Sequence, residues 1–284
     1  MTAGELYRNY LKLLSPIFGE GESSTITAIV FETVANCSRI DIITNPSTIL
    51  DAQIENKLSV CLEELLQHKP VQYVLGEALF CKLKFEVDES VLIPRPETEE
   101  LVAEVIQFAK TKNQSSILEI GTGSGCIAIS IKKNVPHCLM TSVDISKYAL
   151  ETAKKNALLN KVDINFMEMD FLNTENQIQL EMYDVIVSNP PYIPISQKAE
   201  MDKHVTDFEP NNALFVSDEN PLIFYEAIVE FCVPNLKQEG KVFLEIHELF
   251  GEAVKELFHQ HKFETTLLKD MYGKDRIVIA SRFH

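Results

Sequence analysis

The tetrapeptide Asn189-Pro190-Pro191-Tyr192 is the part of this sequence best suited to bind a planar NH2 group. Two consecutive prolines have no N–H to donate to a sheet, so the apolar strand that precedes them must end there. Because proline also fixes its φ angle, the loop presents carbonyl acceptors in a set direction, beside an amide side chain and an aromatic ring. We therefore predict a substrate-binding site formed by Asn189, Pro190, Pro191 and Tyr192.

The nitrogen of such an NH2 group is a poor nucleophile because its lone pair is delocalised. If Asn189 Oδ1 and the Pro190 carbonyl accept its two hydrogens, the nitrogen is held in place and its growing positive charge is stabilised. This chemistry needs no base before transfer, so His247 and Glu119, which also end strands, receive no role. We predict Asn189, Pro190 and Tyr192 as the catalytic residues. The alternative is a structural Pro-Pro turn with a capping Asn.

A glycine-rich turn, Gly121-Thr122-Gly123-Ser124-Gly125, lies between an apolar strand and a helix. Glycines let the backbone approach a ligand closely, and the helix N-terminus offers free N–H groups to a carboxylate or phosphate. The turn alone is ambiguous, because Gly123, Gly125 and Ala128 also fit the G-x-G-x-x-G/A spacing of dinucleotide sites. A plain tight turn is the remaining alternative.

Acidic and aromatic residues end the next two strands. Asp144, about twenty residues beyond the glycine turn, can accept both ribose hydroxyls of a nucleoside, although it could instead cap the following helix. Asp170 and Phe171 could lie against an adenine amino group and ring, or form a structural pair at the strand end. We predict a nucleoside-type cofactor contacted by Gly121, Thr122, Gly123, Ser124, Gly125, Asp144, Asp170, Phe171 and Asn189.

Alternating strands and helices must position these residues, because short apolar runs alternate with helical patterns after residue 96. Such alternation predicts an α/β fold with a largely parallel sheet and helices on both faces. The expected strands are 117–121, 139–145, 164–170, 183–189, 241–247, 265–269 and 276–280, and the expected helices are about 97–112, 125–134, 147–160, 221–236 and 250–261.

The first part of the chain is predicted to be a small helical bundle. The segment 19–24 is expected to separate the first two helices, and Asn45-Pro46-Ser47 to start the third, since proline is tolerated at a helix N-terminus. Residues 80–87 and 91–93 are predicted to form a β-hairpin around the turn at 88–90. The expected domains are a helical bundle at 1–72, a hairpin linker at 73–96 and a cofactor-binding domain at 97–284.

Composition excludes several classes of protein. The 284 residues carry a formal net charge of -16, which disfavours broad attraction to nucleic acid. No apolar run approaches the roughly 20 residues that a bilayer requires, and the N-terminus lacks a secretory pattern, so we expect a cytoplasmic protein that does not enter a membrane. The six cysteines form no CxxC pair, so neither a metal site nor a disulfide framework is expected.

Taken together, these motifs resemble the protein-(glutamine-N(5)) methyltransferases of the HemK/PrmC family, and the similarity spans nearly the whole chain. The glycine turn and the tetrapeptide at 189–192 are shared with other methyltransferases, so further segments make the resemblance specific. These segments are Gln72-Tyr73-Val74-Leu75-Gly76-Glu77, Leu92-Ile93-Pro94-Arg95-Pro96-Glu97-Thr98-Glu99, Phe208-Glu209-Pro210 with Ala213-Leu214, and Gly273-Lys274-Asp275-Arg276.

The resemblance implies S-adenosyl-L-methionine as cofactor and, as substrate, the glutamine in the Gly-Gly-Gln motif of class I peptide chain release factors, with an effect on translation termination. It also implies a seven-stranded, Rossmann-like class I methyltransferase domain, and N-terminal helices that dock the protein substrate. By the matching motifs, the turn 121–125 and Asp144 contact the cofactor, Phe171 lies by the adenine, and Asn189 contacts cofactor and substrate. Some relatives carry Trp in place of Phe171, and Phe lacks the indole N–H.

Three alternatives remain open from the sequence. Arg95 could contact cofactor or substrate, or form a structural ion pair with Glu97 or Glu99. An adenine-amino DNA or RNA methyltransferase would use the same loop, but it must extrude a base and bind phosphates, which the negative charge disfavours. A non-catalytic nucleoside-binding module would need no intact Asn-Pro-Pro-Tyr sequence.

Overall fold

The computed structural model describes residues 1–283, which divide into two compact units. The first consists of Met1–Glu77 together with Asp202–Phe208, and the second contains the rest of the described chain. The first unit thus extends beyond residue 72 and includes a later segment that carries the short helix α9 (Lys203–Thr206).

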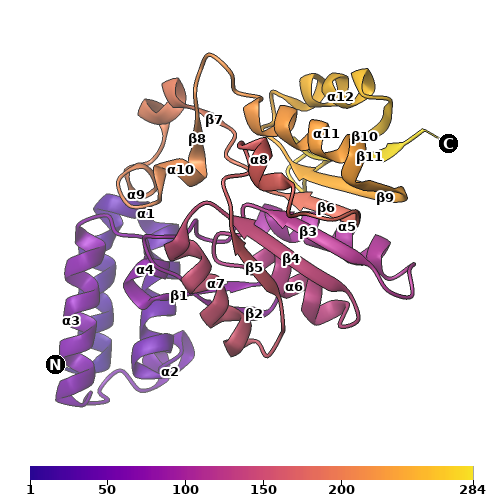
Figure 1. Ribbon diagram of the computed structural model, residues 1–284. Coiled ribbons are helices and arrows are strands. Elements are labelled where there is room, and N and C mark those ends of the chain that lie inside the picture. The colour runs from indigo at the N-terminus through magenta and orange to yellow at the C-terminus, as the bar shows by residue number, and fades with distance from the viewer. Residues whose placement is uncertain (284) are drawn as a thin grey trace. The chain divides into compact units, whose positions relative to one another are not determined.

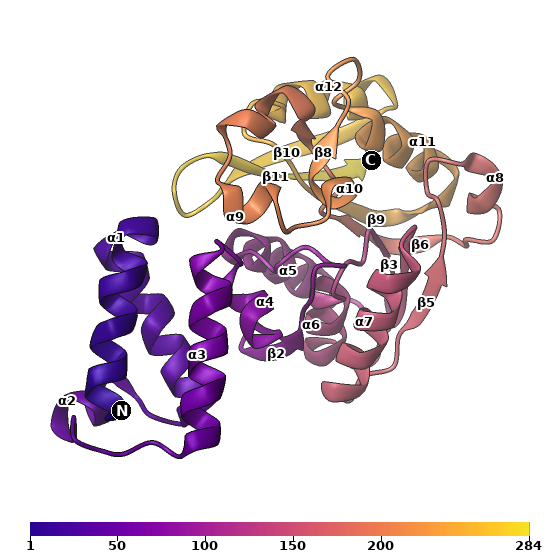
Figure 2. The ribbon, with the colours of Figure 1, turned by 90° about the vertical axis from the view of Figure 1, so that its left-hand side faces the viewer.

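The first unit is built from α1 (Ala3–Ala35), α2 (Arg39–Thr44), α3 (Ala52–Leu66) and α4 (Val71–Leu75). Figures 1 and 2 show α1 and α3 side by side, and the core between the helices includes Tyr10, Phe31 and Leu58, all fully buried. The predicted break at 19–24 appears as a kink in α1, where Gly19 adopts φ 75° and ψ 168°. This conformation is accessible essentially only to glycine.

The predicted start of the third helix at Asn45-Pro46-Ser47 is wrong. The helix α3 begins at Ala52, where Asp51 is the N-cap and accepts the Gln53 N–H at 2.8 Å. Pro46 lies instead in the loop after α2, and its carbonyl accepts the Gly4 N–H at 3.0 Å. The loop pairs with the N-terminus of α1, and this contact between distant residues overrides the local proline signal.

A hairpin exists in the predicted linker, but the predicted pairing of 80–87 with 91–93 is wrong. The strands β1 (Glu77–Phe80) and β2 (Leu83–Glu86) flank Cys81 and Lys82, whose φ angles are 48° and 62°. Two positive φ angles suit a two-residue hairpin turn, but the sequence lacks the Asn or Gly that usually marks one. The segment 88–90 forms a separate turn, and residues 91–93 are not a strand.

A seven-stranded sheet forms the centre of the second unit, in the order β10-β11-β9-β6-β3-β4-β5. The pairs β9–β6, β6–β3, β3–β4 and β4–β5 are parallel, whereas β11 is antiparallel to both β9 and β10. The predicted α/β fold is confirmed. The strands are β3 (Ser116–Ile120), β4 (Leu139–Asp144), β5 (Asn165–Glu168), β6 (Tyr183–Ser188), β9 (Leu236–Glu245), β10 (Phe263–Lys269) and β11 (Asp275–Arg282).

Helices cover both faces of this sheet, with α11 and α12 on one face and α5, α6 and α7 on the other (Figures 1 and 2). The core beneath α11 and α12 includes Tyr225, Phe258 and Phe263, each fully buried. The helices are α5 (Pro96–Ala109), α6 (Cys126–Asn134), α7 (Lys147–Leu159), α8 (Thr174–Gln177), α10 (Asn211–Leu214), α11 (Ile223–Asn235) and α12 (Gly251–Gln260), with the 3-10 helix η1 (Ile195–Glu200) and the short strands β7 (Ile193–Pro194) and β8 (Phe215–Val216) beside them.

Candidate active site

The sheet reverses its strand order beside β3, because β4 and β5 follow on one side while β6 lies on the other. Ligands in open α/β sheets bind at the carboxyl ends of the strands, at such a switch point. The register aligns Ile120 with Val143 and with Ser188, so the turns that follow these three strands meet at one edge. The glycine turn and the tetrapeptide 189–192 therefore lie side by side.

A cavity of about 260 Å³ opens at this edge. Gly125 and Tyr192 do not line it, but all other residues that the sequence predicts for the site do. Gly125 is instead the N-cap of α6 with φ 80°, and a Cβ there would lie 3.1 Å from Ala153 Cβ, so glycine is needed for helix packing. The predicted residues in the lining are Gly121, Thr122, Gly123, Ser124, Asp144, Asp170, Phe171, Asn189, Pro190 and Pro191.

Asp144 holds the glycine turn in place. One carboxylate oxygen accepts the Gly123 N–H at 2.9 Å, and the other accepts the Ser146 N–H at 2.8 Å. The cap of the next helix is Ser146, whose hydroxyl accepts the Ala149 N–H, so Asp144 is not the helix cap. Burial raises the pKa of Asp144, although these backbone N–H groups oppose the rise.

Phe171 presents a rigid apolar wall to the cavity. Its side chain is buried and packs edge-on against Phe231, with ring centroids 5.4 Å apart. The neighbouring Asp170 is exposed, and its Oδ1 accepts the Leu172 N–H at 3.0 Å. An aromatic face and a carboxylate thus border the same end of the cavity.

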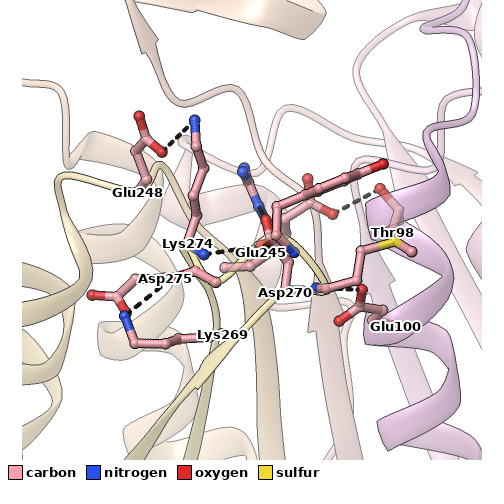
Figure 3. A network of polar contacts seen from close by, with 12 residues as sticks. Thr98, Glu100, Glu245, Glu248, Lys269, Asp270, Lys274 and Asp275 are labelled. Atoms are coloured by element: carbon pink, nitrogen blue, oxygen red, sulfur yellow. Dashed lines mark hydrogen bonds and ion pairs between the residues drawn. The ribbon is translucent and has the colours of Figure 1, made fainter.

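A chain of hydrogen bonds connects Asn189 to Tyr192 through two other elements. Asn189 Nδ2 donates to Thr98 Oγ1 at 3.2 Å, and the Thr98 hydroxyl donates to Glu245 Oε2 at 2.7 Å. The other oxygen, Glu245 Oε1, accepts the Tyr192 hydroxyl at 3.1 Å. Figure 3 shows Thr98 on its helix directed at Glu245. The loop formed by residues 189–192, named the acceptor loop below, is therefore tied to the start of α5 and to the end of β9.

Burial governs the ionisation of this chain. Burial and the neighbouring Glu245 carboxylate raise the pKa of Tyr192, which keeps its phenol protonated and able to donate. Burial also raises the pKa of Glu245, opposed by the hydrogen bond from Thr98 and the positive charge of Arg276. Arg276 is held by Asp270, which accepts its Nε–H at 3.1 Å.

Arg95 does not pair with Glu97 or Glu99, the partners considered from the sequence. Its guanidinium donates to the buried carboxylate of Glu209, which also accepts the Ile93 N–H at 3.2 Å. Glu99 instead accepts the Cys81 N–H at 2.7 Å. Because Arg95 also lines the cavity, its ion pair joins the two segments around 95 and 209 at the site.

Two residues that received no role lie outside the cavity lining. Glu119 is fully buried beneath the glycine turn, where it accepts the Thr122 hydroxyl at 2.7 Å and the Ala128 N–H at 3.3 Å. Burial raises the pKa of Glu119 to about 7. His247 packs against the Tyr192 ring at 6.0 Å between centroids, and burial lowers its pKa.

Sequence reasoning missed Thr98, Glu209 and Glu245. Glu245 ends a parallel strand of the sheet, as Asp144 ends another, so its position did carry a signal. Thr98 stands in the first turn of a helix, where a hydroxyl usually indicates only a local cap. Within residues 1–283 no cluster of three or more His, Cys, Asp or Glu side chains could hold a metal ion, and no helix is long and apolar enough to cross a membrane.

Comparison with known proteins places this chain in a family. Residues 98–208 match the family described as "Methyltransferase small domain", and residues 11–76 match "PrmC N-terminal domain". A release factor glutamine methyltransferase of Flavobacterium psychrophilum is 43% identical over 96% of this chain and 98% of its own length. The enzyme of the same name from Streptococcus pneumoniae is 38% identical over 99% of this chain and 98% of its own.

This chain belongs to the release factor glutamine methyltransferases. The resemblance inferred from the motifs is thereby confirmed. Among solved structures, the hMettl16 catalytic domain in complex with MAT2A 3'UTR hairpin 6 has a TM-score of 0.54 at 13% identity and covers 83% of this chain and 84% of that one. That likeness shows the fold alone.

Proposed function

We propose that this release factor glutamine methyltransferase transfers a methyl group from S-adenosyl-L-methionine to the side-chain amide nitrogen of the glutamine in the Gly-Gly-Gln motif of class I release factors. The observation that supports this most directly is the hydrogen bond from Asn189 Nδ2 to Thr98. It leaves Asn189 Oδ1 as an acceptor at a cavity shared with the glycine turn. Because release factors act in translation, we also propose a cytoplasmic location.

The residues present fit such a cofactor. Gly121 and Gly123 have φ angles of 80° and 52°, and a Cβ built on Gly123 meets no heavy atom within 4 Å, so the turn leaves room for a ligand. Asp144 is proposed to accept ribose hydroxyls, and Asp170 with Phe171 to border the adenine. When bound, the cofactor supplies an electrophilic methyl group on a sulfonium.

The protein's own contribution is to hold the glutamine amide. Asn189 Oδ1 and the Pro190 carbonyl accept the two N–H hydrogens, which fixes the nitrogen and favours the positive charge that grows on it. Pro191 keeps the loop rigid because it fixes the backbone and offers no competing N–H. Tyr192 does not line the cavity, so we assign it a role in holding the loop through Glu245.

The decisive experiment uses purified protein, methyl-labelled S-adenosylmethionine and an intact release factor, followed by mass spectrometry of the product. We expect label on the glutamine of the Gly-Gly-Gln motif, and none on a release factor in which that glutamine is alanine. Label in nucleic acid would support the adenine-amino reaction instead. Label at another residue of the alanine release factor would contradict the assignment of the acceptor.

We further propose that the N-terminal helices dock the release factor. Ile40 and Ile43 lie three residues apart on α2 and are 72% and 68% exposed, so one face of this helix presents an apolar surface to a partner. Deleting the helices is a poor test, because Asp202–Phe208 belongs to the same compact unit. Substitution of surface residues avoids that problem.

The double variant Ile40→Ser, Ile43→Ser should raise KM for an intact release factor while leaving kcat and the cofactor KM unchanged. Leu158→Ser is the matched control, because Leu158 is 79% exposed on α7 of the other unit. Equal KM values for the double variant and the control would reject this docking surface.

A further inference from the structure

The Glu245 carboxylate accepts hydrogen bonds from two hydroxyl groups that lie on different elements of the second unit. Thr98 lies in the first turn of α5, Tyr192 follows β6, and Glu245 is the last residue of β9. The side chains of Thr98 and Glu245 are both buried, so water does not compete for their hydrogen bonds. These hydrogen bonds extend to Asn189, so they can orient its side-chain amide as well as hold the three elements together.

The direction of each hydrogen bond follows from the donors available. A carboxylate only accepts, so Thr98 and Tyr192 must each spend their single hydroxyl hydrogen on Glu245. Thr98 Oγ1 then has only lone pairs to offer and must accept from its other neighbour. That neighbour, 3.2 Å away, is the Asn189 side chain, which therefore turns its NH2 group toward Thr98.

We propose that Glu245 and Thr98 are positioning residues that set the orientation of the Asn189 amide. The amide is nearly symmetric in shape, and the opposite orientation would point NH2 hydrogens at the NH2 group of the acceptor. The hydrogen bonds through Thr98 and Glu245 select the orientation in which Asn189 Oδ1 faces the glutamine NH2 group, before the substrate binds. This inference rests on the proposed function and adds two residues that act on the reaction through the Asn189 side chain.

A purely structural role is the competing explanation, because Glu245 also connects α5 to β9. Another residue of this protein offers a matched control for the structural role of Glu245. Tyr225 is fully buried on α11, and its hydroxyl donates to the backbone carbonyl of Glu245 at 3.1 Å. Tyr225→Phe therefore removes a buried hydrogen bond from the same residue without touching Thr98 or Asn189.

The test compares Thr98→Val, Thr98→Ser and Tyr225→Phe in the methylation assay, with KM measured separately for cofactor and release factor. Thr98→Val keeps the shape but has no hydroxyl, and we expect kcat to fall about 10- to 100-fold, as expected for a misplaced reacting group. The cofactor KM should stay unchanged. Thr98→Ser should restore most of kcat, and Tyr225→Phe should lower the thermal midpoint while keeping kcat.

A second measurement does not depend on the substrate. The side-chain NH2 signal of Asn189 in ¹H–¹⁵N NMR spectra, identified by its loss in Asn189→Ala, should shift in Thr98→Val and keep its position in Thr98→Ser and Tyr225→Phe. An unshifted signal in Thr98→Val would overturn the inference. Equal kcat values for Thr98→Val and Tyr225→Phe would do the same.

The two proposals fail in different ways. If the wild-type protein places no label on the release factor glutamine, the proposed function fails, and the NMR comparison still decides whether Thr98 orients Asn189. If the wild type labels that glutamine and Thr98→Val is as active as Thr98→Ser, only the positioning role fails.

Discussion

At the scale of single residues, the reaction depends most directly on the side chain of Asn189. Asn189→Ala removes the Oδ1 acceptor and leaves the Pro190 carbonyl as the only proposed partner of the glutamine NH2 group. We expect methyl transfer to fall by at least ~100-fold, as happens when one preorganised polar group is removed from an active site. Cofactor binding should remain measurable by calorimetry because the glycine turn and Asp144 are intact. Near-normal turnover would contradict the role of Asn189.

Phe171 allows cofactor stacking to be separated from core packing. Phe171→Leu keeps an apolar side chain but removes the aromatic face at the cavity, and such contacts contribute about 0.5–1.5 kcal/mol. We therefore expect the cofactor Kd to rise roughly 2- to 10-fold, measured by calorimetry.

The control for this substitution is Phe231→Leu. It breaks the same edge-on pair in the core, but Phe231 does not line the cavity. Both variants should lose similar stability, and only Phe171→Leu should weaken cofactor binding. If Phe231→Leu raised Kd equally, the effect would come from packing.

The sequence predicted residues with local signals and missed those whose partners are distant. Asp144 and Asn189 could be found because each lies where a predicted strand ends and stands beside turn residues. The bond between Thr98 and Glu245 joins residues 147 positions apart, and nothing near either of them reveals the other. Only the packing of α5 against β9 brings them together.

At the scale of elements, the apolar runs predicted where the seven strands of the large sheet lie along the sequence, because buried parallel strands are continuously apolar. The strand β9 begins at Leu236, whereas the prediction placed its start at residue 241. The prediction missed the first half of the strand because that half is polar and has no apolar run. Two other predictions failed for a related reason: the hairpin turn expected at 88–90 lies at Cys81 and Lys82, and the helix expected to start beside Pro46 starts at Ala52. Contacts with distant segments, or unusual backbone angles, decide both.

The kink in α1 gives a prediction about backbone conformation. Gly19 has φ 75° and ψ 168°, and a residue with a Cβ is strained there by about 1–3 kcal/mol. Gly19→Ala should lower the unfolding free energy of the first unit by that amount, measured by urea unfolding followed by circular dichroism.

Gly21→Ala is the natural control, because Gly21 is helical and a Cβ there meets no heavy atom within 4 Å. It should stabilise the unit by about 0.4–1 kcal/mol, since alanine restricts the unfolded chain. The two substitutions must therefore act with opposite signs. Destabilisation by both would mean that the helix, rather than the angle at Gly19, is sensitive.

At the scale of the whole molecule, the sequence indicated two parts of different architecture, and it had no means of assigning Asp202–Phe208 to the first compact unit. That segment follows the acceptor loop in the chain and precedes Glu209, the partner of Arg95. Its membership in the unit of the N-terminal helices depends on packing between segments that are distant in sequence. The short, largely polar sequence of this segment gives no local sign that it packs with the N-terminal helices.

The stability of the molecule should depend on pH through Glu119. Its pKa is raised by burial to about 7 in the folded protein, above its ordinary 4.5, so the folded state binds this proton more tightly than the unfolded state. The stabilisation of the folded state by this tighter proton binding is therefore complete below about pH 4.5, and it is lost as pH rises through about 7. Over that window it amounts to roughly 3 kcal/mol of unfolding free energy.

Glu119→Gln has no proton to lose, so its stability relative to wild type should improve by that amount between about pH 5 and pH 8, measured by urea unfolding. Thr122 can still donate to the amide oxygen, which keeps the glycine turn in place. Glu264→Gln makes the same chemical change at an exposed position of β10 and should follow the wild-type pH profile. Parallel profiles for wild type and Glu119→Gln would show that Glu119 is not the group whose burial costs stability at neutral pH.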